Sequence, residues 1–166
     1  MINTRRFILF GLVGLLLMSA GCQTRSDELE HTSVARFLIE SDSTKGAIQV
    51  VLPISRVSLR VAPKPVITEF DIRRVVEAEV AMGRCLLFQL SPAANRDLYR
   101  LTASNIGRRL VVVINGETLG ARMIDRPLEA GTLFIFLEVP DASLPDLVEN
   151  LNATTMKIQE EVERRG

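Results

Sequence analysis

The clearest local signals of secondary structure lie in residues 91–116, which read SPAANRDLYRLTASNIGRRLVVVING. Ser91 is a favourable N-cap and Pro92 suits the first helical position, so the stretch predicts a helix that begins there. Apolar side chains then recur at helical spacing up to residue 106. Gly107 follows, and we expect it at the C′ position, where glycine commonly ends a helix.

A hairpin is predicted directly after this helix. Residues 110–114 read LVVVI, which indicates a buried strand. Asn115 and Gly116 come next, and both tolerate the positive φ angles that a type I′ turn requires. Residues 118–124 are therefore expected to pair back as the second, antiparallel strand.

Short runs of β-branched and apolar residues predict further strands on both sides of this block. They lie at residues 34–39, 48–52, 57–61, 72–80, 84–90 and 132–139. Pro53 follows one of these runs and favours an edge or bend for the pair 48–61. Strands and helices do not alternate one for one, and a long helix is expected from Ser143. The pattern predicts an α+β fold after an N-terminal signal peptide, with a mainly antiparallel sheet and two main helices packed on one face.

The N-terminus has the layout of a secretory signal peptide. Arg5 and Arg6 precede twelve apolar or glycine residues, 7–18, and small residues lead to Cys22. Twelve residues make about 18 Å of helix, shorter than a bilayer core of about 30 Å. A cysteine after Ala-Gly resembles the lipobox of bacterial lipoproteins. Residues 1–21 are therefore predicted to be a lipoprotein signal peptide and Cys22 the lipid attachment site, with palmitate-like chains as the membrane anchor.

An ordinary signal peptide, cut nearby with Cys22 incidental, is the alternative. Either reading places the mature protein in a bacterial cell envelope, facing the periplasm. Residues 22–33 are mostly polar and predict a tether, residues 34–152 the domain, and residues 153–166 an extension of the C-terminal helix.

Composition excludes several classes of function. The chain has 166 residues, 47% of them hydrophobic, and its 20 basic side chains balance 20 acidic ones. A nucleic-acid-binding protein would carry a basic excess, so no nucleic acid partner is expected. A disordered chain would have a lower apolar content. The length is sufficient for one domain that needs no disulfide or metal to fold.

No catalytic or metal-binding pattern accompanies these elements. His31 is the one histidine and lies in the tether, away from Cys85, so no zinc site and no cofactor are expected. Glu77 and Glu79 share a strand face, but no base accompanies them and a solvated face explains them. The two arginines at 108–109 either complement the helix dipole or contact an acidic partner. We therefore expect a protein that is not an enzyme.

The block 91–116 resembles the head subdomain of the first periplasmic domain of SecD, a subunit of the protein-export translocase. In that family a Ser/Thr-Pro-capped helix ends in Thr-x2-Asn-Val/Ile-Gly-Lys/Arg-Arg-Leu, and an apolar strand with an Asp/Asn-Gly hairpin follows. Those places are filled here by Thr102, Asn105, Ile106, Gly107, Arg108, Arg109, Leu110, Asn115 and Gly116. The resemblance extends over about residues 34–152.

The resemblance implies contact with an emerging, unfolded preprotein. The membrane spans of SecD, its base subdomain and its intramembrane acidic residues have no counterpart in this sequence, so the proton-driven motor is not implied. What is implied is a membrane-anchored, non-enzymatic lipoprotein that binds unfolded secretory polypeptide or translocase subunits on the outer side of the cytoplasmic membrane.

Binding is expected by strand addition, in which an extended peptide pairs with an exposed sheet edge. The candidate edge residues are Val75, Glu77 and Glu79, in the half-polar strand 72–80, and the pair that contains Pro53 is the other candidate edge. The alternative function is a structural envelope lipoprotein, a homo-oligomer that self-associates through its C-terminal helix. Its heptad seam would consist of Leu144, Val148, Leu151, Thr155, Ile158 and Val162.

Overall fold

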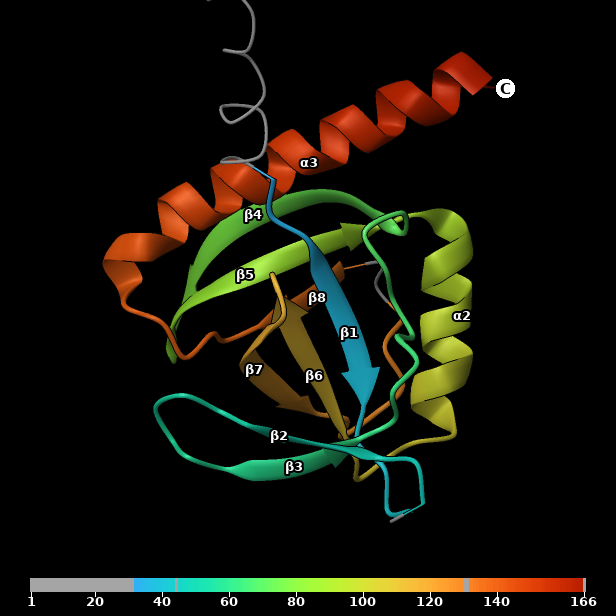
Figure 1. Ribbon diagram of the computed structural model, residues 1–166, viewed down its shortest axis with the longest axis vertical. Helices are drawn as coiled ribbons and strands as arrows, with labels where there is room; N and C mark the ends of the chain where they lie inside the picture. The colour runs from blue at the N-terminus through green and yellow to red at the C-terminus, as the bar shows by residue number, and fades with distance from the viewer. Residues whose placement is uncertain (1–31, 44, 130–131, 166) are drawn as a thin grey trace, which may run out of the picture. The chain divides into compact units, whose positions relative to one another are not determined.

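The computed structural model describes residues 32–43, 45–129 and 132–165, and it confirms the α+β fold. In these residues the strands form three antiparallel sheets, and two α-helices, α2 and α3, accompany them (Figure 1). The predicted signal peptide, Cys22 and most of the tether lie outside the described residues.

Sheet 1 has the strand order β1 (Ala35–Ile39), β6 (Arg109–Ile114) and β7 (Glu117–Met123). The predicted hairpin between β6 and β7 is confirmed, because Asn115 and Gly116 form its two-residue loop with φ of 52° and 86°. The turn therefore forms where the sequence predicts it, and it sets the register of β7 on β6.

Sheet 2 has the order β4 (Ile72–Val80), β5 (Gly83–Leu90) and β8 (Thr132–Ile135). Sheets 1 and 2 enclose the main core, where the rings of Phe37 and Phe88 meet edge to face with centroids 5.0 Å apart. Both helices contribute to the same core, through Ala94 and Leu98 of α2 and Leu144 and Leu151 of α3. Side chains from sheets 1 and 2 and from both helices therefore pack in one core.

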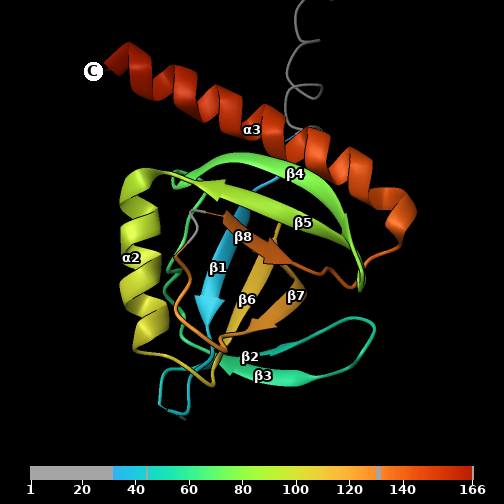
Figure 2. The same ribbon diagram turned by 180° about the vertical axis from the view of Figure 1, so that it is seen from behind.

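Sheet 3 is the hairpin of β2 (Ile48–Val51) and β3 (Ser58–Val61). Leu59 and Val61 pack on Val111, which lies on the face of sheet 1 opposite the main core. Figures 1 and 2 show this hairpin and α3 at opposite ends of the domain, with α2 along one side. β2 is the outer strand of the hairpin.

Helix α2 spans Pro92–Ala103 and ends earlier than predicted. Its beginning is confirmed, because the Ser91 hydroxyl accepts a hydrogen bond from the Ala94 N–H at 3.2 Å. The Asn105 side-chain amide donates to the Leu101 carbonyl at 2.8 Å, where a longer helix would use a backbone N–H. Gly107, with φ of 88°, therefore lies in the turn after the helix and not at C′.

The strand predicted at 132–139 is shorter than expected, because only Thr132–Ile135 form a strand, β8. β8 ends at Ile135, and the chain then moves to β7, where the Glu138 N–H donates to the Leu119 carbonyl at 2.6 Å. The approach is so close that a Cβ on Gly120 would collide with the Phe136 carbonyl oxygen. Glycine at position 120 permits this passage, which also covers part of the outer edge of β7.

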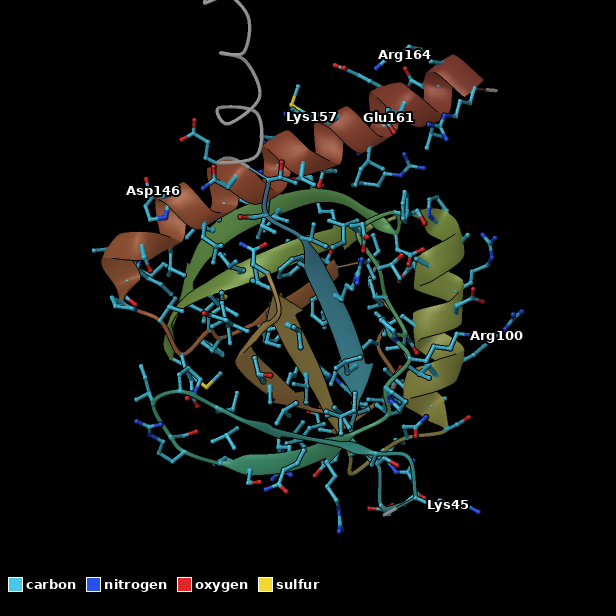
Figure 3. The ribbon with its side chains drawn as sticks, viewed as in Figure 1. Lys45, Arg100, Asp146, Lys157, Glu161 and Arg164 are labelled. Carbon is cyan, nitrogen blue, oxygen red and sulfur yellow. The ribbon has the colours of Figure 1, made fainter. Side chains whose placement is uncertain are left out.

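Helix α3 spans Leu144–Arg165, without a break at the predicted domain boundary. It lies along β4 in both ribbon views (Figures 1 and 2). Thr154 and Thr155 are buried, and the Thr154 hydroxyl accepts a hydrogen bond from the Ser33 N–H at 3.0 Å. Beyond them Lys157, Glu161 and Arg164 project from the helix, and every residue from 160 to 165 is exposed (Figure 3).

Candidate functional site: the sheet edges

Val75, Glu77 and Glu79 lie on the outer strand of sheet 2, as the sequence predicts. β4 pairs with β5 on one side only. The Val75 N–H donates to Asn152 Oδ1 at 2.9 Å, and Asn152 Nδ2 donates to the Val75 carbonyl at 2.8 Å. Backbone groups of alternate residues point to the same side of an antiparallel strand, so Glu77 and Glu79 present theirs on this outer side too.

The side-chain amides of α3 occupy part of this edge as a neighbouring strand would. Asn152 bonds both backbone groups of Val75, and Gln159 Nε2 donates to the Arg73 carbonyl at 3.0 Å. Neither amide was predicted to contact the strand edge. One signal was present: Asn152 follows Val148 by four residues and so shares the side of the helix that packs on the sheet. The edge near Glu77 and Glu79 receives no side-chain hydrogen bond from the described part of α3.

The carboxylates of β4 differ in their surroundings. Glu77 is half-buried and forms an ion pair with Arg84 of β5. Glu79 is exposed, and no ion pair joins it to another described residue. The two side chains therefore do not converge on a common partner, which agrees with a solvated strand face.

β2 presents the other candidate edge, and here main-chain groups remain open. The Leu52 N–H donates to the Val57 carbonyl at 3.0 Å, which closes the β2–β3 hairpin. Because pairing alternates along an antiparallel ladder, Gln49 and Val51 direct their N–H and C=O groups away from β3. Within the described residues no other strand pairs with that side of β2.

Apolar side chains surround this open edge. They are Ile48 and Val51, each 48% exposed, with Ile54 at 67% and Val57 at 40% in the turn and beside β3. Such exposure is unusual for β-branched side chains in a small domain, and it favours contact with another apolar chain.

Glu138 holds the turn of this hairpin. Its carboxylate accepts hydrogen bonds from the N–H groups of Ile54 and Ser55, both at 2.8 Å. Burial raises the pKa of Glu138, but the hydrogen bonds from Ser55 and Ile54 outweigh it and hold the pKa below its ordinary value. The open edge of β2 is thus fixed to the segment that crosses from sheet 2 to sheet 1.

Solved structures of SecDF resemble this fold, although the sequence itself matches no known family. No protein-family model matches the sequence, and no curated protein matches it. SecDF in its super-membrane-facing form aligns with a TM-score of 0.56 and 16% identity, over 73% of this chain and 19% of that one. A second structure, of the membrane component SecDF that enhances protein export, aligns with a TM-score of 0.58 and 15% identity, over 80% of this chain and 70% of that one.

The chain shares its fold with SecDF. The resemblance to a SecD periplasmic domain, predicted from residues 91–116, is therefore confirmed as a likeness of structure. The chain spans about a fifth of the length of the super-membrane-facing SecDF chain. No helix among the described residues is long and apolar enough to cross a membrane.

The two arginines of the SecD-like motif pair within their own chain. Arg108 contacts Asp42 at 2.8 Å, and Arg109 contacts Glu40 at 3.1 Å. Glu40 also accepts a hydrogen bond from the Arg109 N–H at 2.9 Å. Both arginines thus connect the start of β6 with the end of β1 and the loop that follows it.

The remaining residues considered for chemistry do not converge. Cys85 is buried, and burial raises the pKa of its thiol, which disfavours the reactive thiolate. In residues 32–43, 45–129 and 132–165 no group of three or more His, Cys, Asp or Glu side chains is placed to hold a metal ion. Among the residues that the sequence singles out, the sheet edges remain as candidates for binding.

Proposed function

We propose that this protein is a membrane-anchored, non-enzymatic lipoprotein that binds extended polypeptide, or a segment of the export machinery, by strand addition at the open edge of β2. The observation that carries the proposal is the outward direction of the main-chain groups of Gln49 and Val51, next to exposed apolar side chains. Main-chain pairing is largely independent of sequence, which suits an unfolded client. The fold shared with SecDF, a membrane component that enhances protein export, supports the same function.

The expected affinity is low. Two residues at the edge offer four main-chain groups, and each net hydrogen bond contributes about 0.5–1.5 kcal/mol. The gross gain of about 2–6 kcal/mol is reduced by the cost of ordering the bound chain, so dissociation constants in the millimolar range are expected. Several such contacts along one membrane surface would act together on a long client.

The test is an NMR titration with a reduced, carboxymethylated secretory protein as the unfolded client. Amide resonances of β2 should shift. Val51→Pro removes the outward N–H but leaves the pairing with β3, because the Val51 N–H is not used in that ladder. Val51→Ala is the matched control that keeps the N–H. We expect the shifts to disappear in the proline variant alone.

The edge at Val75, Glu77 and Glu79 is the second place where a client could pair. Asn152 already occupies Val75, so a client at β4 would pair beside Glu77 and Glu79 or displace the amide. Glu79→Pro, with Glu79→Ala as its control, tests this edge in the same titration. If neither proline variant changes the shifts, or if no client binds at millimolar concentration, strand addition is wrong.

Membrane anchoring through lipidated Cys22 is part of the proposal. Residues 23–32 would then connect the domain to the lipid, with a reach of up to about 33 Å when extended, because Ser33 is already buried in the domain. The mature chain keeps 18 basic and 20 acidic side chains, because Arg5 and Arg6 are removed with the signal peptide. Its own charge therefore gives no attraction to anionic lipid, and the acyl chains must supply the attachment.

Self-association through α3 is the alternative. Most of the seam packs within its own domain, since Leu144, Leu151 and Thr155 are buried, whereas Val162 is 60% exposed. A partner copy would find only the last turns of the helix available. Light scattering on the purified protein separates this alternative, which requires a discrete homo-oligomer, from polypeptide binding, which does not.

A further inference from the structure

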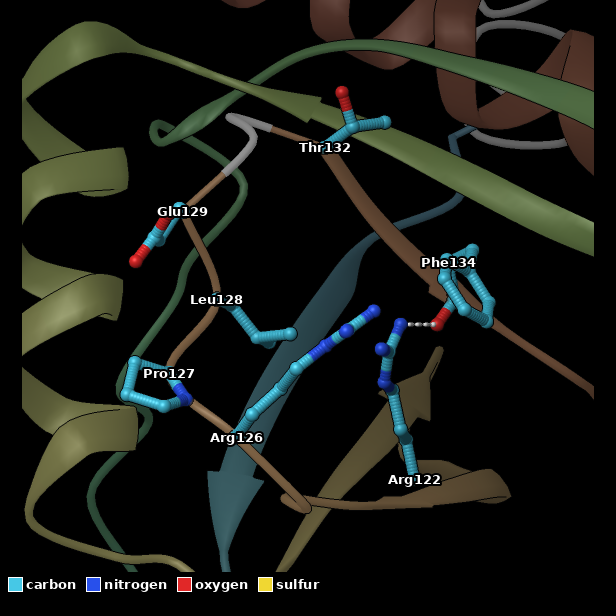
Figure 4. Close-up of a pocket in the computed structure, with 7 residues that line it drawn as sticks. All are labelled: Arg122, Arg126, Pro127, Leu128, Glu129, Thr132 and Phe134. Carbon is cyan, nitrogen blue, oxygen red and sulfur yellow. Dashed lines mark hydrogen bonds between the residues drawn. The ribbon is translucent and has the colours of Figure 1, made fainter.

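A pocket of about 480 Å³ lies beside β8, apart from the edge of β2. Arg122 of β7 and Arg126 of the following segment direct their guanidinium groups into it, next to one another (Figure 4). Glu129 also lines the pocket, but its carboxylate points away from both arginines. Pro127, Leu128 and the Phe134 ring supply apolar walls.

Arg122 is held in place by two contacts with Phe134. Its Nη1 donates to the Phe134 carbonyl at 2.9 Å, and its guanidinium lies 3.8 Å from the centroid of the Phe134 ring. Burial lowers the pKa of Arg122, Asp125 raises it, and the neighbouring charge of Arg126 lowers it further. The fold therefore fixes a partly desolvated cation beside a second one.

Neither guanidinium has a carboxylate at ion-pair distance in the part of the chain that the structure describes. Two like charges side by side repel, here a half-buried Arg122 and an exposed Arg126, and the repulsion is relieved when an anion lies between them. Guanidinium groups bind carboxylates through paired N–H···O bonds, which are among the stronger hydrogen bonds in proteins.

We propose that this arginine pocket, formed by Arg122, Arg126, Pro127, Leu128 and Phe134, binds a carboxylate that carries an apolar body. The carboxylate lies between the two guanidinium groups and the apolar body lies against Leu128 and Phe134. The volume is within the range of small-ligand sites in proteins. The same chemistry is found in a small aromatic acid and in the C-terminal residue of a polypeptide that ends in Phe or Leu.

Hydrocinnamate, titrated into the full chain and followed by NMR, tests the proposal. Its neutral amide has the same apolar body without the charge, and inorganic phosphate has the charge without the body. We expect saturable shifts around the pocket with hydrocinnamate and at least tenfold weaker binding of the amide. Equal binding of acid and amide, tighter binding of phosphate, or no saturation at millimolar concentration overturns the proposal.

Arg126→Gln removes one guanidinium whose side chain has no hydrogen bond or ion pair within the described residues. Arg100→Gln is the control, since Arg100 projects from α2 into solvent (Figure 3). Hydrocinnamate should bind about tenfold or more weakly to Arg126→Gln and unchanged to Arg100→Gln. Equal binding to both variants overturns the assignment.

A peptide with a free C-terminal Phe, compared with its amidated form, identifies the source. Tighter binding of the free peptide than of hydrocinnamate assigns the pocket to polypeptide ends, and weaker binding assigns it to small acids. Because the pocket does not involve β2, the proline variant Val51→Pro should leave hydrocinnamate binding unchanged, which separates this proposal from strand addition.

Discussion

Replacing Asn152 with alanine tests whether the helix amide stabilises the edge of β4. The change removes both hydrogen bonds to Val75, at 2.9 and 2.8 Å. These bonds are only partly buried, so water can reach the backbone groups of Val75 once the amide is removed. Each of the two groups that loses its partner should therefore cost about 1–1.5 kcal/mol of stability. Alanine is about 0.6 kcal/mol more favourable than asparagine inside a helix. The net loss of stability should be about 1.5–2.5 kcal/mol.

Asn150→Ala is the matched control on the same helix. The Asn150 side chain makes no hydrogen bond with the described residues, so its replacement should leave stability unchanged or raise it by about 0.6 kcal/mol. Helix propensity is common to both variants. The difference between them, about 2–3 kcal/mol, therefore measures the two hydrogen bonds at the strand edge.

Urea unfolding provides the assay, with far-UV circular dichroism as the signal because the chain has no tryptophan. The midpoint of Asn152→Ala should fall while the slope stays constant, since the folded state exposes no additional core. Asn152→Asp should also be destabilised near neutral pH, because an ionised carboxylate cannot donate to the Val75 carbonyl. Equal stability of the Asn152→Ala and Asn150→Ala variants would show that the Asn152 amide does not stabilise the edge of β4.

Four further predictions concern separate parts of the chain. Gly120→Ala should lose about 1–3 kcal/mol or more of stability in thermal unfolding, because the new Cβ collides with the Phe136 carbonyl; a wild-type melting temperature would contradict the close approach. The stability that Glu138 contributes is complete above the ordinary glutamate pKa of about 4.3 and is lost as the pH falls through the lowered pKa of this carboxyl. Glu138→Gln should therefore make the free energy of unfolding depend less on pH in acid, and an unchanged pH dependence would show that Glu138 does not hold the hairpin turn. Deletion of residues 160–166 should leave the unfolding midpoint and the oligomeric state unchanged, since all described residues there are exposed; loss of a discrete oligomer by light scattering would instead favour self-association. Cys22→Ser should abolish incorporation of labelled palmitate and release the protein from membranes, and a variant that retains both would exclude lipidation at that residue.

Local signals in the sequence predicted the elements that depend on neighbouring residues. Ser91 begins α2 because its hydroxyl reaches the third residue of the same helix, and Asn115 with Gly116 makes a turn whose φ angles those two residues tolerate. Such contacts lie within a few positions of one another. The strand edges at Val75 and β2 were identified for the same reason, from alternation and a nearby proline.

Features decided by distant residues could not be predicted in this way. The bonds between Asn152 and Val75 join positions 77 residues apart. The segment after β8 passes close to Gly120 of another strand, and the early end of α2 depends on an Asn105 side chain that competes with the backbone. The arginine pocket likewise forms only when β7 and β8 are side by side.

Helix α3 covers part of the edge of β4, but it is synthesised later than that strand. The strand is formed by residues 72–80, but the amides that pair with it are at positions 152 and 159. A chain that emerges from its N-terminus first has the β4–β5 hairpin, residues 72–90, available long before that helix. Until residue 152 has emerged, the backbone groups of Val75 stay available to any extended neighbour. The nascent protein therefore passes through a period in which the edge of β4 is itself open to strand addition, the kind of pairing proposed for the edge of β2.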